Sequence, residues 1–396
     1  MPGGAGVRRP DHQTTTRPTA GPAADGGPED GLPESRGTLP DASGGLPGAG
    51  AAAPPRPTDP DGVTAEAVLA PYLRGQAADF LRSLRLHREH SAPSDAGGQG
   101  AEAASRALRR SARRISGSLH TFRSALDPVW ADHLRTELAW LSGTLAREHA
   151  YAGRLTRLVD ALHQLSGAAL PAARGTEPTG STRPAAGSPG KAPSASSEAQ
   201  GRAVLGVGAA RAGALLERQL TLARTRAHSA ALQALGSSRF HAVADAVALL
   251  ASEVPLAPGT TGRGTEALLE PAERAEQRLI GAVAALPPDE SAEPYNEAQD
   301  APWHQARLLL RLHRYAHEVV LGAADPVLTG AGRALDLHRD AAEAAGAAAA
   351  AARTPRIAPA TAYALGVLHA DQRHEVEAAR AVFRETWPYA AAMTAP

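Results

Sequence analysis

Apolar residues recur every three or four positions through most of the chain from residue 63 to residue 391, and no stretch shows the alternation of a half-buried strand. Leu69, Leu73 and Phe80, for example, share one helical face, and Thr64 stands where a helix N-cap is expected. The pattern predicts helices at about 64–90, 101–126, 130–165, 203–235, 239–254, 265–286, 303–322, 327–353 and 359–391. The third helix contains Gly143 and Gly153, at either of which it could break. We therefore expect an all-α fold.

Other stretches lack this periodicity. Residues 1–62 are rich in Gly and Pro and hold five arginines and eight acidic residues, a composition that predicts a disordered acidic arm. Residues 166–200 are rich in Ser, Pro and Gly and predict a disordered linker. Residues 287–302 form an acidic loop. These boundaries divide the folded part into a first helical half, 63–165, and a remainder, 201–391.

Composition narrows the picture further. Aromatic residues make up 4% of the chain and hydrophobic residues 43%, so Ala, Leu and Val must form the core, as in closely packed helices. The absence of cysteine excludes disulfides, thiolate metal sites and a cysteine nucleophile. No apolar run reaches the roughly 20 residues of a membrane span, so we expect a cytoplasmic protein without a membrane partner. Basic and acidic residues balance at 41 each, so any electrostatic function needs a local patch.

Such a patch is predicted twice. Lys191 is the only lysine, so the remaining basic residues other than histidine are arginines, whose planar forks suit oxyanions. One predicted helix carries a stripe of Arg106, Arg109, Arg110, Arg113 and Arg114, and another carries His304, Arg307, Arg311 and Arg314. An offset of 198 residues (304 minus 106) superimposes the two stripes. We interpret this as an internal duplication of a helical bundle, which gives two pseudo-symmetric antiparallel bundles.

The second stripe lies on a helix that is apolar around most of its circumference, with Leu310 on one side of the stripe and Leu308 and Tyr315 on the other. A largely buried helix rarely carries several guanidinium groups unless anions compensate them. Those anions are either internal carboxylates or a ligand, and the sequence leaves both open. Two facing stripes would suit a linear polyanion, and the lack of nearby stacking aromatics favours a phosphate polymer over nucleic acid.

The same residues resemble the CHAD family, the conserved histidine α-helical domain, over roughly residues 63–390. The first family pattern, V-H-x-x-R-V-x-x-R-R-L-R-S-x-L-x-x-F, is matched at Arg109, Arg113, Arg114, Leu119 and Phe122, with Arg106 replacing the histidine. The second, L-H-x-x-R-I-x-x-K-R-L-R-Y, is matched at His304, Arg307, Arg314 and Tyr315, with Arg311 for the lysine. A third segment resembles L-G-x-H-x-D-A, with His338 and Asp340 kept and Asp336 replacing the glycine.

The resemblance implies paired four-helix bundles with a basic groove, binding of inorganic polyphosphate, and an association with polyphosphate granules. It implies no catalytic residue, metal or cofactor. Carried over to this sequence, the polyphosphate-binding residues are Arg106, Arg109, Arg113, Arg114, His304, Arg307, Arg311, Arg314 and His338.

Two alternatives stay open. The segment 145–150 in the first half has lost the family's glycine and aspartate, which would suit a scaffold with a degenerate phosphate site. A metal-dependent phosphohydrolase would need carboxylate ligands, for which Asp340 and Glu343 are the nearest candidates. His313 and His317 stand four residues apart but lack further spaced ligands, so we predict no metal site there.

Overall fold

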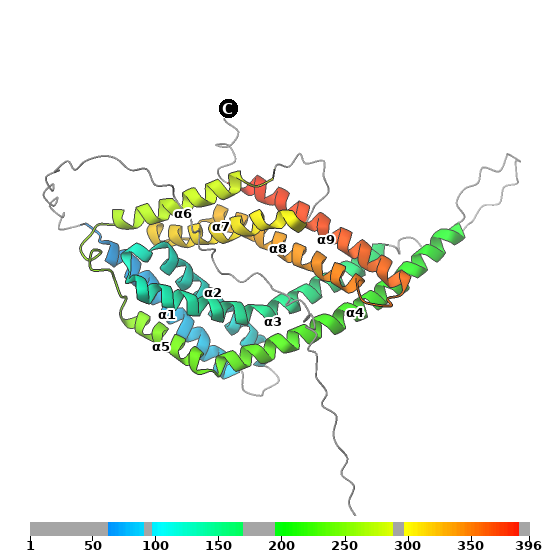
Figure 1. Cartoon of the computed structure of the whole chain (residues 1–396), viewed down its shortest axis with the longest axis horizontal. Helices are drawn as coiled ribbons and strands as arrows, with labels where there is room; N and C mark the ends of the chain where they lie inside the picture. The colour runs from blue at the N-terminus through cyan, green and yellow to red at the C-terminus, as the bar shows by residue number, and fades with distance from the viewer. Residues whose placement is uncertain (1–61, 91–96, 169–194, 288–296, 388–396) are drawn as a thin grey trace, which may run out of the picture. The chain divides into compact units, whose positions relative to one another are not determined.

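A computed structural model describes residues 62–90, 97–168, 195–287 and 297–387 (Figure 1). Within these ranges the regular secondary structure is helical, joined by turns and loops, with isolated bridges between Thr64 and Gly264 and between Leu126 and Leu256. The helices are α1 (Ala65–His90), α2 (Gly97–Thr121), α3 (Pro128–Ala168), α4 (Ala195–Leu235), α5 (Ser238–Ser252), α6 (Glu266–Ala284), α7 (Asp300–Leu321), α8 (Pro326–Ala352) and α9 (Pro359–Thr386), with short 3-10 turns η1 (Arg123–Ala125) and η2 (Glu297–Gln299). The all-α prediction is confirmed.

Helix ends differ from the predicted ones in a few places. The helix expected to reach residue 126 ends at Thr121 and passes into η1. α3 runs unbroken through Gly143 and Gly153, because the buried Leu141, Leu145 and Leu158 hold it against its neighbours on either side of both glycines. Residues 166–168 and 195–200, expected in the linker, are helical. The predictions for 1–61, 169–194 and 288–296 lie outside the described residues.

The ends of α7 and α8 show how local sequence sets the helices that carry the site. α7 ends at Gly322, whose φ of 70° is the left-handed conformation that glycine adopts without strain. Asp325 caps α8, accepting hydrogen bonds from the backbone N–H groups of Val327 and Leu328 at 2.6 and 3.1 Å, and Pro326 follows in the first turn. The turn between the two helices is therefore short and defined at both ends.

Apolar residues gather in two main clusters. The first is built by α1, α2, α3 and α5 around Leu73, Phe80 and Phe122, and α7 contributes Ala316 and Val319 to it. The second packs the far part of α3 against α4, α8 and α9. Alanine dominates the buried face of α8, which lets α9 approach closely, as expected for a core poor in aromatics. The long helices α3 and α4 contribute to both clusters.

α2 and α7, the two helices with arginine stripes, pack against each other. Gly117 allows the contact, since a Cβ there would lie 2.6 Å from the ring of Tyr315. Beside it, Arg114 donates two hydrogen bonds to Glu318 at 3.0 and 2.9 Å, and the Tyr72 hydroxyl lies 3.3 Å from the same carboxylate. One buried carboxylate thus joins α1, α2 and α7.

This junction predicts a specific loss of stability. Glu318→Ala removes the carboxylate that pairs with the half-buried Arg114 guanidinium, so we expect it to lower the free energy of unfolding by about 3 kcal/mol. Urea denaturation measures the change.

Glu270→Ala is the matched control. Its carboxylate is 75% exposed and pairs with Arg274 on the surface of α6, so its loss should cost less than about 0.5 kcal/mol. Equal losses in the two variants would show that the Arg114–Glu318 pair does not hold the helices together.

Candidate anion-binding pocket

The two arginine stripes meet at one pocket. It has a volume of ≈ 230 Å³ and is walled by α2, α7 and α8. Its lining residues are Arg110, Arg113 and Arg114 from α2, Arg307, Leu310, Arg311, Arg314 and Tyr315 from α7, and Gly332 and Asp336 from α8. Six guanidinium groups therefore share the pocket with one carboxylate, a strongly cationic setting for a small volume.

The helical period explains how the arginines converge. On α7, Arg307, Arg311 and Arg314 lie four and three residues apart and so project from one face. The opposite face is anchored by apolar side chains, among them the fully buried Ala306 and Ala316. On α2, the buried Leu108, Ile115 and Leu119 face the first apolar cluster, which turns the arginines toward α7.

The arginines differ in how firmly they are held. The hydrogen bonds that Arg114 donates to Glu318 raise the pKa of Arg114 above its usual range, so this side chain is permanently charged and fixed. Arg314 donates a hydrogen bond to the hydroxyl of Thr329 on α8 at 3.2 Å. The Nε of Arg113 is buried and has no hydrogen-bond partner among the described residues. Arg113 thus has an N–H group that could donate a hydrogen bond to a bound oxyanion.

Arg307 is more deeply buried than Arg114, which also pairs with a carboxylate. Its side chain is 8% exposed, and its Nε donates to an oxygen of Asp336 at 2.7 Å. Burial, followed by repulsion from Arg311 and Arg339, lowers the pKa of Arg307 from its usual value. Partial desolvation alone would raise the pKa of Asp336, but the charges of Arg307, Arg339 and Arg311 outweigh it and hold that pKa below its usual range. The carboxylate is therefore ionised at neutral pH.

Gly332 positions Arg314. A Cβ at Gly332 would lie 2.9 Å from the Nη1 of Arg314, closer than side-chain contacts allow. The guanidinium lies directly over the α8 backbone at this point, which only a glycine permits. Gly330, two residues earlier, has no such neighbour, since its Cβ would lie 3.9 Å from Thr386.

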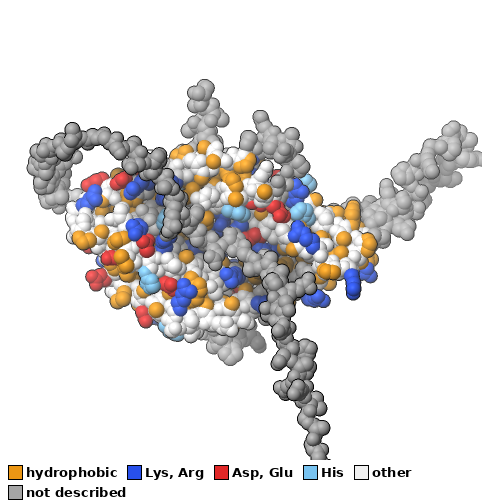
Figure 2. All heavy atoms as spheres, in the orientation of Figure 1, with side chains coloured by type: hydrophobic (Ala, Val, Ile, Leu, Met, Phe, Trp, Pro, Cys, Tyr) orange, Lys and Arg blue, Asp and Glu red, His pale blue; other side chains and the backbone are white. Residues whose placement is uncertain are grey.

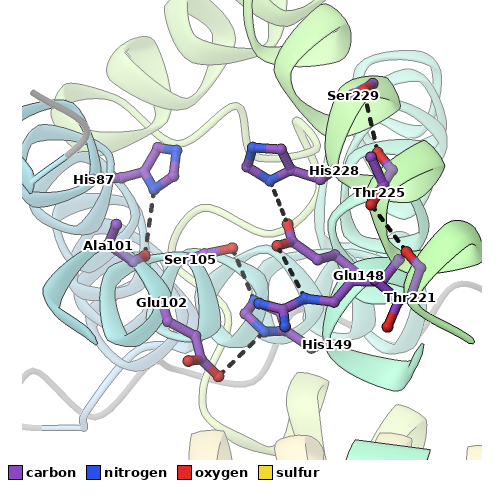
Figure 3. A network of polar contacts seen from close by, with 11 residues as sticks. His87, Ala101, Glu102, Ser105, Glu148, His149, Thr221, Thr225, His228 and Ser229 are labelled. Atoms are coloured by element: carbon purple, nitrogen blue, oxygen red, sulfur yellow. Dashed lines mark hydrogen bonds and ion pairs between the residues drawn. The ribbon is translucent and has the colours of Figure 1, made fainter. Parts of the chain in front are cut away.

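Arg106 and Arg109 lie outside the pocket lining. They belong to the neighbourhood of His149 on α3, whose ring nitrogens lie 3.3 Å from Ser105 and 3.5 Å from Glu102 (Figure 3). Burial, followed by the charge of Arg109, lowers the pKa of His149. Figure 3 also shows His228 of α4 turned to Glu148 and His87 of α1 turned to the backbone of α2. This part of the first stripe faces a polar network between helices.

His304 and His338 also lie outside the lining. His338 is 1% exposed, stacks on Trp303 and approaches Asp300 at 3.2 Å. The ring of His304 packs edge-on against it, 5.8 Å away between centroids. Burial lowers the pKa of both histidines, with the Asp300 contact opposing the effect at His338. Both rings are therefore neutral at pH 7.

The pocket brings together five of the predicted site residues, namely Arg113, Arg114, Arg307, Arg311 and Arg314. The binding roles predicted for Arg106, Arg109, His304 and His338 stay predictions. The prediction left out Arg110, although its spacing of three and four residues from Arg113 and Arg114 was a usable signal. It also left out Gly332 and Asp336, whose importance depends on contacts with another helix.

The carboxylates considered for a metal-dependent reaction are engaged by arginines. Asp340 pairs with Arg339 at 2.6 Å, and Glu343 pairs with Arg154 at 2.5 Å. The rings of His313 and His317 lie 6.2 Å apart. Within the described ranges, no group of three or more His, Asp or Glu residues is arranged to hold a metal ion. Nor does any described helix combine the length and apolarity needed to cross a membrane.

Basic side chains are dispersed among acidic and apolar ones on the face seen in Figure 2. That face shows no single large basic patch, in keeping with a net charge of zero. The convergence of arginines is found in the walled pocket.

Comparisons with known proteins identify relatives of this chain. A protein-family model described as the CHAD domain matches residues 75–349. Among solved structures, PptA from Streptomyces chartreusis has 56% sequence identity and a TM-score of 0.65, with 82% of this chain and 99% of that chain covered. The comparison with curated proteins found no match.

The position of Arg314 over Gly332 yields a prediction. Gly332→Ala should displace the guanidinium, because the end of a flexible side chain gives way more easily than the α8 backbone. Alanine also favours the helix by roughly 0.5–1 kcal/mol, so the variant should fold at least as stably as the native chain. We expect a severalfold weaker affinity for phosphate anions, measured by isothermal titration.

Gly330→Ala places the same methyl group two residues away on α8, in ordinary contact with its surroundings, and should bind normally. The role assigned to Gly332 is wrong if both variants bind like the native chain.

Proposed function

The chain belongs to the CHAD family, and on this premise we propose that it binds inorganic polyphosphate in the pocket between α2, α7 and α8. The observation that carries the proposal is the convergence of six arginines on one pocket with a single carboxylate. Binding of this polymer is also what the family resemblance implies. The phosphate contacts are assigned to Arg110, Arg113, Arg307, Arg311 and Arg314, with Arg114 supporting the charge of the site.

The chemistry of the pocket suits a phosphate chain. A guanidinium fork can hold two phosphate oxygens at once, and the arginines of α7 repeat about once per helical turn. Successive arginines can therefore engage successive parts of a linear polymer. Because each phosphate unit carries charge, the free energies of several arginine–phosphate contacts contribute together to the affinity.

A nucleic acid fits this pocket less well. Tyr315 is the aromatic residue of the lining, and it is 7% exposed and packed beneath Arg114 and against Gly117. Its ring is therefore not open for base stacking, the contact that most single-strand-binding proteins use. The proposed ligand is the bare phosphate polymer.

We assign the chain a binding role without catalysis, since Asp340 and Glu343 are held in ion pairs with arginines. Polyphosphate granules are the proposed location. The duplication of a four-helix unit and the division at residues 166–200 are also kept as proposals. The facing positions of the α2 and α7 stripes support the duplication.

The decisive experiment removes two cations from α7. Arg307→Ala combined with Arg311→Ala should weaken binding of long-chain polyphosphate by at least about 100-fold, because each lost charge-assisted hydrogen bond costs about 1.5–3 kcal/mol. The logarithm of affinity should also fall less steeply with salt, since fewer ions are released. Titration at two salt concentrations, with single-stranded DNA as competitor, measures both effects.

Arg218→Ala with Arg226→Ala is the matched control, because it removes the same charge from exposed positions on α4 that do not line the pocket. A pocket that binds polyphosphate requires the α7 variant alone to lose affinity and, as a fluorescent fusion, to leave granules. If both double variants lose affinity equally, or neither does, the pocket is not the site.

The pocket also predicts a flat pH profile. Arginine stays protonated throughout the physiological range, Asp336 stays ionised, and the buried His304 and His338 are already neutral. Affinity should therefore change less than about twofold between pH of about 6.5 and 8.5, in contrast to a site that depends on histidine charge. A steep loss of binding as pH rises through this range would assign the positive charge to histidines instead.

A further inference from the structure

One residue of the pocket opposes its charge. Asp336 is the single carboxylate among the lining residues, and one of its oxygens lies 2.7 Å from the Nε of Arg307. This is the distance at which a phosphate oxygen would meet the same donor. The chain therefore supplies an anion of its own at one of the positions where the ligand is expected.

The two carboxylates around the pocket are held very differently. Glu318 is 9% exposed, receives two hydrogen bonds from Arg114, and lies beside the Tyr72 hydroxyl. Its displacement would leave a charge buried and unpaired, which is costly. Asp336 is 60% exposed and accepts a hydrogen bond from Arg307. Its carboxylate can turn into water at the cost of that hydrogen bond and of part of its attraction to Arg311 and Arg339.

Arg307 depends on an anion more than Asp336 does. Its side chain is only 8% exposed, and Arg311 and Arg339 lie near enough to repel it. A guanidinium in this setting needs a negative partner at all times. Either Asp336 or a phosphate can serve, but both compete for the same Nε–H edge.

We propose that Asp336 is an internal competitor, which occupies the Arg307 position of the anion pocket in the unliganded protein and is displaced when a phosphate binds. The inference rests on the proposed function. Asp336 keeps Arg307 paired while the pocket is empty and lowers the affinity of the pocket for phosphate. The residue thereby sets how tightly, and how reversibly, a polyphosphate chain is held.

The test compares Asp336→Asn with the native chain in titrations with long-chain polyphosphate. Asparagine keeps the shape and the hydrogen-bond acceptor, so the fold should persist, but it is a weaker partner for Arg307. We expect affinity to rise on the order of tenfold, because a like charge next to the ligand is removed and Arg307 becomes available.

Asp340→Asn is the matched control. Asp340 lies one turn further along α8, is 48% exposed and pairs with Arg339, but it does not line the pocket. It should bind as the native chain does. A gain in Asp340→Asn equal to that in Asp336→Asn would reduce the effect to net charge and overturn the competitor role.

A double variant separates competition for Arg307 from general electrostatic repulsion of the ligand by the Asp336 carboxylate. If Asp336 acts by holding Arg307, then Asp336→Asn should give no more than a small gain when Arg307 is already alanine. A full tenfold gain in the Arg307→Ala background would overturn the displacement at Arg307, even though the carboxylate repels the ligand.

The outcomes also separate a failure of the competitor role of Asp336 from a failure of polyphosphate binding. Binding by the native chain with no gain in Asp336→Asn overturns the competitor alone. Binding by Asp336→Asn and not by the native chain supports the competitor in its strongest form. Absence of binding in both chains overturns polyphosphate binding, and the competitor with it.

Discussion

Mutual repulsion among arginines is the constraint around which this protein is arranged. Six guanidinium groups from α2 and α7 face one pocket of ≈ 230 Å³, and helices so charged would separate unless something offset the repulsion. A few polar side chains offset this repulsion. Glu318 fastens Arg114, Thr329 receives Arg314, and Asp336 pairs with Arg307. The apolar faces of α2 and α7, buried in the first cluster, provide the cohesion that these polar contacts could not supply alone.

With these contacts made, the pocket lining still has a net positive charge. Only one of the lining residues is acidic, and Glu318 acts at the edge of the site on Arg114. A protein that needed only internal stability would gain by replacing such arginines with apolar residues, since buried ion pairs contribute little net stability. The excess charge is therefore better explained by a ligand than by the packing of the helices.

The sequence predicted the helices well because they carry long apolar stripes and recognisable capping or helix-ending residues, such as Asp325 and Pro326 at the start of α8. It also identified the arginine stripes on the helices that became α2 and α7, and indicated what two facing stripes would bind. It could not predict that Arg106 and Arg109 would lie outside the pocket lining and near enough to His149 to lower its pKa, because the surroundings of an arginine depend on which helix packs beside it. The roles of Gly332 and Asp336 in the pocket could not be predicted from the sequence either. Asp336 was seen in the sequence as a departure from a family glycine, but its contact with Arg307 arises only when α8 lies against α7.

The absence of lysine from the pocket has a consequence for control in the cell. Acetylation can silence a lysine by removing its charge, whereas methylation of an arginine leaves the charge in place. Lys191, the only lysine of the chain, lies outside the described residues, and all the cations that line the pocket are arginines. Acylating enzymes and metabolites therefore have nothing to act on there. The number of positive charges in the pocket is constant, and its occupancy follows from the anions that compete for them.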